Sequence, residues 1–141
     1  MAVASIRKEV SVDAPVDHVW RAVRDVGRVH VRLAQNFVVD TRLDGDSRLV
    51  TFVNGTVVRE RIVDIDDTAR RLAYSVVEWR ATHHNASFQV FPEGETGSRL
   101  VWVADLLPND LAPIVDAMME QGCQAMKHTL GRTATHQPTS A

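Results

Sequence analysis

The sequence predicts an α+β fold in which a curved antiparallel sheet wraps around one long C-terminal helix. Three observations predict it. Short segments with alternating apolar residues, each closed by a turn signal, fill the region from residue 36 to residue 107. One alternating segment and a short amphipathic helix precede this region, and an apolar stripe of helical spacing follows it. The predicted order is therefore strand, helix, short helix, six strands and long helix.

Length and composition limit the class of protein. A chain of 141 residues fits one domain, which we expect over residues 1–131, followed by a small polar tail over 132–141 that we expect to be disordered. The net charge of −2 argues against a nucleic-acid partner. The N-terminus is too polar for a signal peptide, and no stretch approaches about 18 apolar residues, so we expect a cytoplasmic protein without a membrane span.

The N-terminal elements are predicted from period and capping signals. Residues 5–12 alternate with a period of two, which is typical of a strand. Asp13 is expected to cap the following helix, with Pro15 in its first turn and Gly27 ending it. Residues 28–34 fit either a second short helix or an irregular loop. The first helix carries an apolar stripe: Val16, Val19, Trp20 and Val23.

Six strands are expected next, joined by short turns that favour an antiparallel meander. The dipeptide Asn54-Gly55 predicts a two-residue hairpin, and Asp44-Gly45-Asp46 and Pro92-Glu93-Gly94 predict two further turns. The expected strands cover residues 37–43, 49–53, 57–65, 71–79, 85–91 and 100–107.

The last element is a helix of about 20 residues, which gives a rod of roughly 30 Å. Asn109 or Asp110 is expected to cap its start, with Pro113 in the first turn, and Gly131 its end. Such a rod crosses a whole small sheet. Its apolar stripe comprises Leu111, Ile114, Val115, Met118, Gly122, Ala125, Met126 and Leu130.

These features resemble a known superfamily. The opening KEVSVDAPVDHVWRAVRDV resembles the entry of the polyketide cyclase/dehydrase branch of the START-like (SRPBCC, Bet v 1-like) superfamily. NGTVVRERIVDIDDTARRLAYSV is similar to its fourth and fifth strands, and GSRLVWVADLLP resembles its seventh. The resemblance covers about residues 3–131 and implies the helix-grip fold. The family includes lipid carriers, hormone receptors, aromatic-polyketide cyclases and chaperone activators, and no motif here matches a catalytic set residue by residue.

A helix that covers only a strip of a bent sheet leaves a hollow, and such pockets are mainly apolar with a few polar groups. Arg59 and Arg61 share one strand face and belong in solvent, so Glu60 is expected to point inward and to need a partner. The resemblance implies an acidic residue at this position in the hormone-receptor branch. The expected pocket residues are Val58, Glu60, Ile62, Tyr74, Val76, His84, Ala86, Phe88, Trp102, Met118, Met119, Gly122 and Met126.

Two interpretations of the long helix remain open. Glycine in a helix interior costs about 1 kcal/mol relative to alanine, so Gly122 needs a reason. The first interpretation is that Gly122 and the flexible methionine side chains adapt to a ligand. The second is that Gly122 permits close contact between helix and sheet and that the methionines fill the core.

Three functions are compatible with this fold. The leading hypothesis is binding of a hydrophobic or aromatic small molecule of lipid, polyketide or isoprenoid type, without a cofactor. The second is a polyketide cyclase or dehydratase, in which Glu60, Tyr74 and His84 do general acid–base work. The same three residues also fit a satisfied hydrogen-bond network that orients a ligand or closes the mouth of the cavity. The third is a protein-interaction module of the chaperone-activator kind.

The remaining signals are weaker. An interaction module needs an exposed apolar patch, and no predicted face shows that pattern, although Val29, Val31 and Leu33 are candidates for part of one. His83 and His84 point to opposite strand faces and therefore cannot bind one ion, so no metal is expected. A single cysteine, Cys123, is expected to be buried and inert. The sequence fits a monomer or a homodimer.

Overall fold

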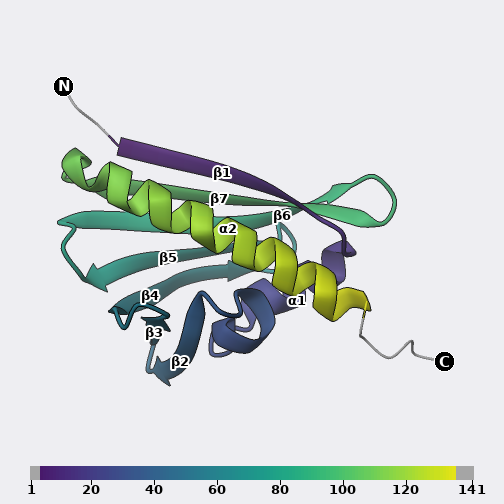
Figure 1. Cartoon of the computed structure of the whole chain (residues 1–141), viewed down its shortest axis with the longest axis horizontal. Helices are drawn as coiled ribbons and strands as arrows, with labels where there is room; N and C mark the ends of the chain where they lie inside the picture. The colour runs from purple at the N-terminus through teal and green to yellow at the C-terminus, as the bar shows by residue number, and fades with distance from the viewer. Residues whose placement is uncertain (1–3, 136–141) are drawn as a thin grey trace.

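Seven antiparallel strands form one curved sheet, and the long helix α2 lies across it, as Figure 1 shows. The computed structural model describes residues 4–135. The strand order is β1-β7-β6-β5-β4-β3-β2, so β2 to β7 form a meander and β1 joins the edge beside β7. The strands are β1 (Ala4–Val12), β2 (Val38–Asp44), β3 (Ser47–Phe52), β4 (Val57–Asp66), β5 (Arg71–Glu78), β6 (His83–Glu93) and β7 (Gly97–Leu107).

The helices follow the predicted order. They are α1 (Val16–Arg24), the π-helical turn η1 (Val29–Leu33), the 3₁₀ turn η2 (Asn109–Leu111) and α2 (Ala112–Thr135). This arrangement confirms the helix-grip architecture. Within residues 4–135, no helix combines the length and the apolar character needed to cross a bilayer.

The start of α1 and the end of α2 differ from the prediction. Asp13 does not cap α1, which follows Pro15 without a side-chain cap. Gly131 does not end α2, which continues to Thr135 and includes the first part of the expected tail. The last turns of α2 are held from outside, because Gln35 N donates to Thr129 Oγ1 at 3.0 Å and His18 Nε2 lies 2.9 Å from Thr133 Oγ1. Tertiary contacts of this kind outweigh a local glycine signal. Residues 136–141 of the expected tail lie outside the described residues.

The β3–β4 hairpin differs from the prediction by one residue. Phe52 N donates to Thr56 O at 2.8 Å, so the loop consists of residues 53–55 rather than of Asn54-Gly55 alone. Gly55 adopts a φ of 90°, the left-handed conformation that a three-residue hairpin requires at this place. The resulting register puts Arg48 directly opposite Glu60, whereas a two-residue loop would put Leu49 there.

The curvature of the sheet has a local cause. Register shifts interrupt the ladder between Val38 and Asp40 on β2, and twice along β4, between Arg59 and Glu60 and between Ile62 and Asp64. Irregularities of this kind bend a strand and increase its twist. They lie in the half of the sheet that curls away from β1, and the concave face there carries the site described next.

The buried face of α2 is rotated slightly from the predicted stripe. Ile114 is 40 % exposed, whereas Met119 and Cys123, both outside that stripe, are buried. The opposite face carries charged residues, two of which, Asp116 and Glu120, hold Lys8 of β1 at 2.9 and 3.1 Å. This contact fastens the helix to the edge of the sheet.

Candidate ligand-binding cavity

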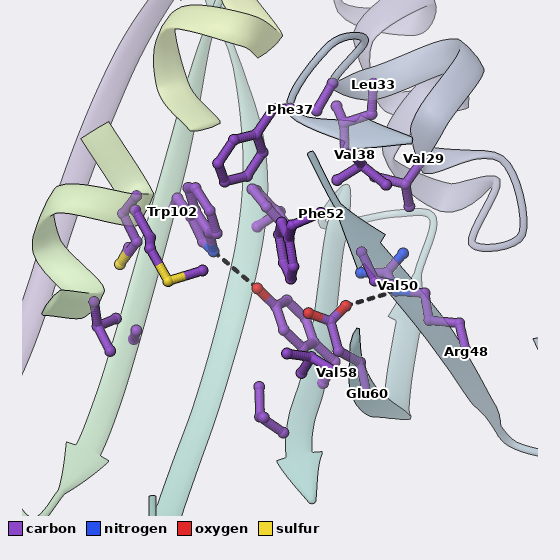
Figure 2. Close-up of a pocket in the computed structure, with 18 of the residues that line it drawn as sticks. Val29, Leu33, Phe37, Val38, Arg48, Val50, Phe52, Val58, Glu60 and Trp102 are labelled. Atoms are coloured by element: carbon purple, nitrogen blue, oxygen red, sulfur yellow. Dashed lines mark hydrogen bonds and ion pairs between the residues drawn. The ribbon is translucent and has the colours of Figure 1, made fainter. Parts of the chain in front are cut away.

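A hollow lies between the concave face of the sheet, α2 and the segment from η1 to β2 (Figure 2). Its volume is about 80 Å³. One water needs about 10–15 Å³ by this measure, so there is room for roughly five to eight waters, or about 150–240 Å³ of liquid. The walls are mainly aliphatic and aromatic. The volume corresponds to a molecule of about one or two rings.

Most of the predicted pocket residues line this hollow, and three do not. Ile62 lies at the second register shift of β4, and Ala86 is part of the hydrophobic core. Gly122 packs behind the wall rather than forming it. The predicted residues that line the hollow are Val58, Glu60, Tyr74, Val76, His84, Phe88, Trp102, Met118, Met119 and Met126.

Part of the wall was not predicted from the sequence. The spacing of Val29 and Leu33, four residues apart, is the signal that points to a buried face, yet both were candidates for an exposed patch. That expectation is wrong: these two residues are 6 % and 1 % exposed, and only Val31 faces outward. The missed lining residues are Val29, Leu33, Ala34, Phe37, Val38, Arg48, Val50, Phe52, Trp79, Ala104 and Val115.

Glu60 points inward, as strand parity predicts, and it has an ion-pair partner. Arg48 Nε donates to Glu60 Oε1 at 2.8 Å, and the two side chains are 2 % and 10 % exposed. The cross-strand register of β3 and β4 brings them together. The guanidinium also lies 5.3 Å from the centre of the Tyr74 ring and is within 3.4 Å of the Val26 carbonyl oxygen. The negative charge of the inward Glu60 carboxylate is thus balanced by the adjacent Arg48 guanidinium.

Tyr74 stands beside this pair at the head of an aromatic stack. Its hydroxyl oxygen accepts a hydrogen bond from Trp102 Nε1 at 3.0 Å, drawn in Figure 2. Phe88 stacks between the two rings, at 5.9 Å from Tyr74 and 4.8 Å from Trp102. Burial, and after it the negative charge of Glu60, raises the pKa of Tyr74. The phenol therefore keeps its proton and can donate it to a hydrogen bond.

His84 lines the same hollow next to the partly exposed Trp79, whose ring centre is 6.3 Å away. Burial, and to a smaller extent the charge of His83, lowers the pKa of His84. The imidazole is consequently neutral at pH 7. Its Nδ1 is buried and has no hydrogen-bond partner among the described residues. Unsatisfied buried nitrogen atoms are uncommon and call for an explanation.

Gly122 explains how the helix reaches the aromatic stack. A Cβ atom at this position would lie 2.9 Å from Trp102 Cζ3 and 3.1 Å from Phe37 Cε2. Close helix–sheet contact is therefore the correct interpretation of this glycine. The methionines leave both interpretations open, because Met118, Met119 and Met126 line the hollow while Met119 and Met126 also belong to the hydrophobic core.

Other reactive side chains lie outside this arrangement. Cys123 is buried, and burial together with the nearby Glu120 raises its pKa to about 11, so it is a thiol at neutral pH. No cluster of three or more histidine, cysteine or acidic residues suited to a metal occurs among residues 4–135. The polar chemistry of the hollow comes from Arg48, Glu60, Tyr74 and His84.

A small helix-grip domain with an internal, mainly apolar hollow is the class that this fold and site define. The chain belongs to the family described as polyketide cyclase/dehydrase and lipid transport, whose model matches residues 3–136. This membership confirms the resemblance to the polyketide cyclase branch of the START-like superfamily. Comparison with curated proteins found no sequence match.

Solved structures of similar shape cover nearly the whole chain. A solution structure from Thermobifida fusca is 26 % identical, with a TM-score of 0.72, and covers 96 % of this chain and 99 % of its own. Norcoclaurine synthase from Thalictrum flavum, in complex with dopamine and hydroxybenzaldehyde, is 15 % identical with a TM-score of 0.73, covering 99 % and 90 %. The di-domain ARO/CYC protein BexL of the BE-7585A biosynthetic pathway is 16 % identical with a TM-score of 0.79, covering 95 % of this chain and 48 % of BexL.

Proposed function

We propose that the protein binds a small hydrophobic or aromatic molecule, of the polyketide, isoprenoid or lipid type, in the hollow between the sheet and α2. The observation that carries the proposal is the mainly apolar hollow itself, about 80 Å³ in volume, into which only a few polar groups project. Membership of a family that includes cyclases and lipid transporters supports it.

The shape of the wall favours aromatic ligands. Tyr74, Phe88 and Trp102 form one stacked surface on β5, β6 and β7, and Phe37 and Phe52 pack edge to face at 5.2 Å. Flat rings add stacking energy to simple burial. The norcoclaurine synthase complex holds dopamine and hydroxybenzaldehyde, which are one-ring molecules. Three methionine side chains allow the hollow to adjust to larger shapes.

Binding is testable with a matched pair of variants on α2. Met118 lines the hollow and is partly exposed, whereas Ile114, one turn earlier, is exposed and does not line it. We expect Met118→Trp to abolish binding of a fluorescent naphthalene-based probe and Ile114→Trp to leave it intact. Native mass spectrometry of the protein purified from its own host would identify the natural ligand. Equal probe binding by both variants would contradict the proposed location.

A second candidate function, a cyclase or dehydratase, is favoured by one arrangement: the protonated Tyr74 and the neutral His84 face the same hollow. His84 would take a proton from the carbon beside a ketone, while the Tyr74 hydroxyl donates a hydrogen bond to the enolate oxygen. The proton held by His84 exchanges with solvent, and His84 then returns a proton to the enolate carbon, or to the oxygen atom of a second carbonyl group that the enolate carbon has attacked. We expect deuterium exchange beside the carbonyl of an aryl ketone to slow as His84 becomes protonated and to be lost in His84→Gln. An unchanged exchange rate would leave binding as the function.

A further inference from the structure

The charges inside the hollow cancel. Arg48 and Glu60 are the charged side chains among its described lining residues, and they form an ion pair with each other. The remaining titratable groups there, Tyr74 and His84, are neutral at pH 7. Burial raises the pKa of the Tyr74 hydroxyl and lowers the pKa of the His84 imidazole, and both shifts favour the uncharged form. A ligand therefore enters a hollow without net charge.

Besides His84 Nδ1, two hydrogen-bonding positions in the described part of the hollow are free to serve a ligand. Arg48 binds only Oε1 of Glu60, and no donor within residues 4–135 hydrogen-bonds to Oε2. Figure 2 shows one carboxylate oxygen of Glu60 toward Arg48 and the other turned away from it. The Tyr74 hydroxyl accepts from Trp102, so its own proton remains to be donated. These two positions offer a ligand one strong acceptor, Glu60 Oε2, and one donor, the Tyr74 hydroxyl.

Building on the proposed function, we propose that the hollow selects an uncharged aromatic molecule that carries a hydroxyl group, and that the Arg48–Glu60 pair sets this selectivity. The hydroxyl donates to Glu60 Oε2, and the ring lies on the stack of Tyr74, Phe88 and Trp102. Hydrogen bonds to an ionised acceptor are stronger than those between neutral groups.

Charged ligands are rejected for reasons of charge balance. A carboxylate in the hollow would lie close to Glu60, and Arg48 is already engaged with that residue. An ammonium group would be attracted by Glu60 but repelled by the Arg48 guanidinium next to it. Either ion would leave an uncompensated charge in apolar surroundings, which is costly. The Arg48–Glu60 pair therefore sets specificity in two ways: it disfavours charged ligands, and Glu60 accepts a hydrogen bond from a ligand hydroxyl group.

Three probes of one shape test this inference: naphthalene, 2-naphthol and 2-naphthoate, measured by calorimetry or fluorescence at pH 7. We expect the native protein to bind 2-naphthol about tenfold or more tightly than naphthalene, and 2-naphthoate more weakly than both. Glu60→Gln removes the negative charge and leaves Arg48 unbalanced. In this variant, 2-naphthoate becomes the tightest ligand, because its carboxylate then pairs with Arg48.

The matched control is Glu78→Gln, since Glu78 also pairs with an arginine, Arg59, but is 69 % exposed. This control keeps the native order of the three probes. If Glu60→Gln folds poorly, the double variant Arg48→Met/Glu60→Gln removes both charges. It should bind naphthalene normally and lose most of the preference for 2-naphthol.

The outcomes separate this inference from the proposed function. Binding of naphthalene to the native protein, with the order of 2-naphthol and 2-naphthoate unchanged by Glu60→Gln, would overturn the selectivity and leave the binding function standing. Failure of the native protein to bind any of the three probes would overturn both. A reversal of order in Glu60→Gln, absent from Glu78→Gln, is the result that we expect.

Discussion

The two faces of β3 and β4 carry the same chemistry in opposite surroundings. On the concave face, Arg48 and Glu60 pair at 2.8 Å with side chains 2 % and 10 % exposed. On the convex face, Arg59 reaches Asp44 at 3.0 Å and Glu78 at 3.2 Å, and these two carboxylates are 59 % and 69 % exposed. Arg59 and Glu60 are neighbours in sequence and face opposite sides. Water and salt screen the two outer pairs much more than the inner one, so the inner pair is expected to have the larger effect on stability.

The largest expected effect comes from breaking the inner pair. Arg48→Met leaves the Glu60 carboxylate buried without a partner, and we expect a loss of about 3–5 kcal/mol in the free energy of unfolding. Arg59→Met on the outer face should cause a much smaller loss. Urea unfolding of the two variants measures the contrast. Equal losses would show that burial does not distinguish the two pairs.

A second variant sharpens the interpretation of the first. Adding Glu60→Gln to Arg48→Met removes the unpaired charge, and a neutral pair of similar size is often as stable as a buried ion pair. We expect the double variant to recover most of the lost stability, which a double-mutant cycle in urea would quantify. No recovery would mean that the packing of the arginine stem, rather than its charge, stabilises the fold.

Two glycines of α2 provide the next contrast between the concave face and the surface. The Cβ of Gly122→Ala meets the rings of Trp102 and Phe37, so we expect a loss of about 1–3 kcal/mol despite the better helix propensity of alanine. Gly131 has nothing within 4 Å of such a Cβ, and Gly131→Ala should stabilise the protein by about 0.5–1 kcal/mol. Thermal unfolding of both variants gives the signs, and a stabilising Gly122→Ala would contradict the close contact.

The smallest effect concerns pH. Because burial lowers the pKa of His84, the folded protein binds this proton less readily than the unfolded chain. The free energy of unfolding is therefore unaffected by His84 well above the unfolded histidine pKa of about 6.5, and it decreases as the pH falls below that value, because the unfolded chain then binds the proton more tightly. His84→Gln should therefore flatten the fall in the free energy of unfolding between pH 7.5 and pH 5, measured by urea unfolding at several pH values. The same slope for the native protein and the variant would contradict this role of His84.

The sequence predicts which strand residues point to the concave face better than it predicts how the charge of Glu60 is neutralised. Alternation alone turns Glu60, Tyr74 and Trp102 inward, because a strand that is buried on one side needs a period of two. Arg48 escaped detection because the Asn54-Gly55 signal predicts a two-residue loop, and that register puts Leu49 opposite Glu60. The extra loop residue, Val53, is not a typical turn residue, so the local turn signal does not reveal that the loop has three residues.

The segment from η1 to β2 was missed for a different reason. Its π-helical turn has only five residues, so the four-residue spacing of Val29 and Leu33 gives a single repeat, too little to distinguish a buried face from an exposed one. Their burial depends on the sheet and α2, which come later in the chain. The extension of α2 past Gly131 has the same origin, since α1 and Gln35 hold its last turns.

The three-residue loop at 53–55 has an evolutionary consequence. Loss of one residue there would slide β3 by one position against β4 and carry the Arg48 guanidinium from the inside of the domain to the outside. Glu60 would then stand alone among apolar walls. Insertions and deletions in a surface hairpin are usually tolerated, yet in this hairpin they would change which molecules the interior accepts. Relatives that differ in the length of this loop should therefore differ in ligand charge.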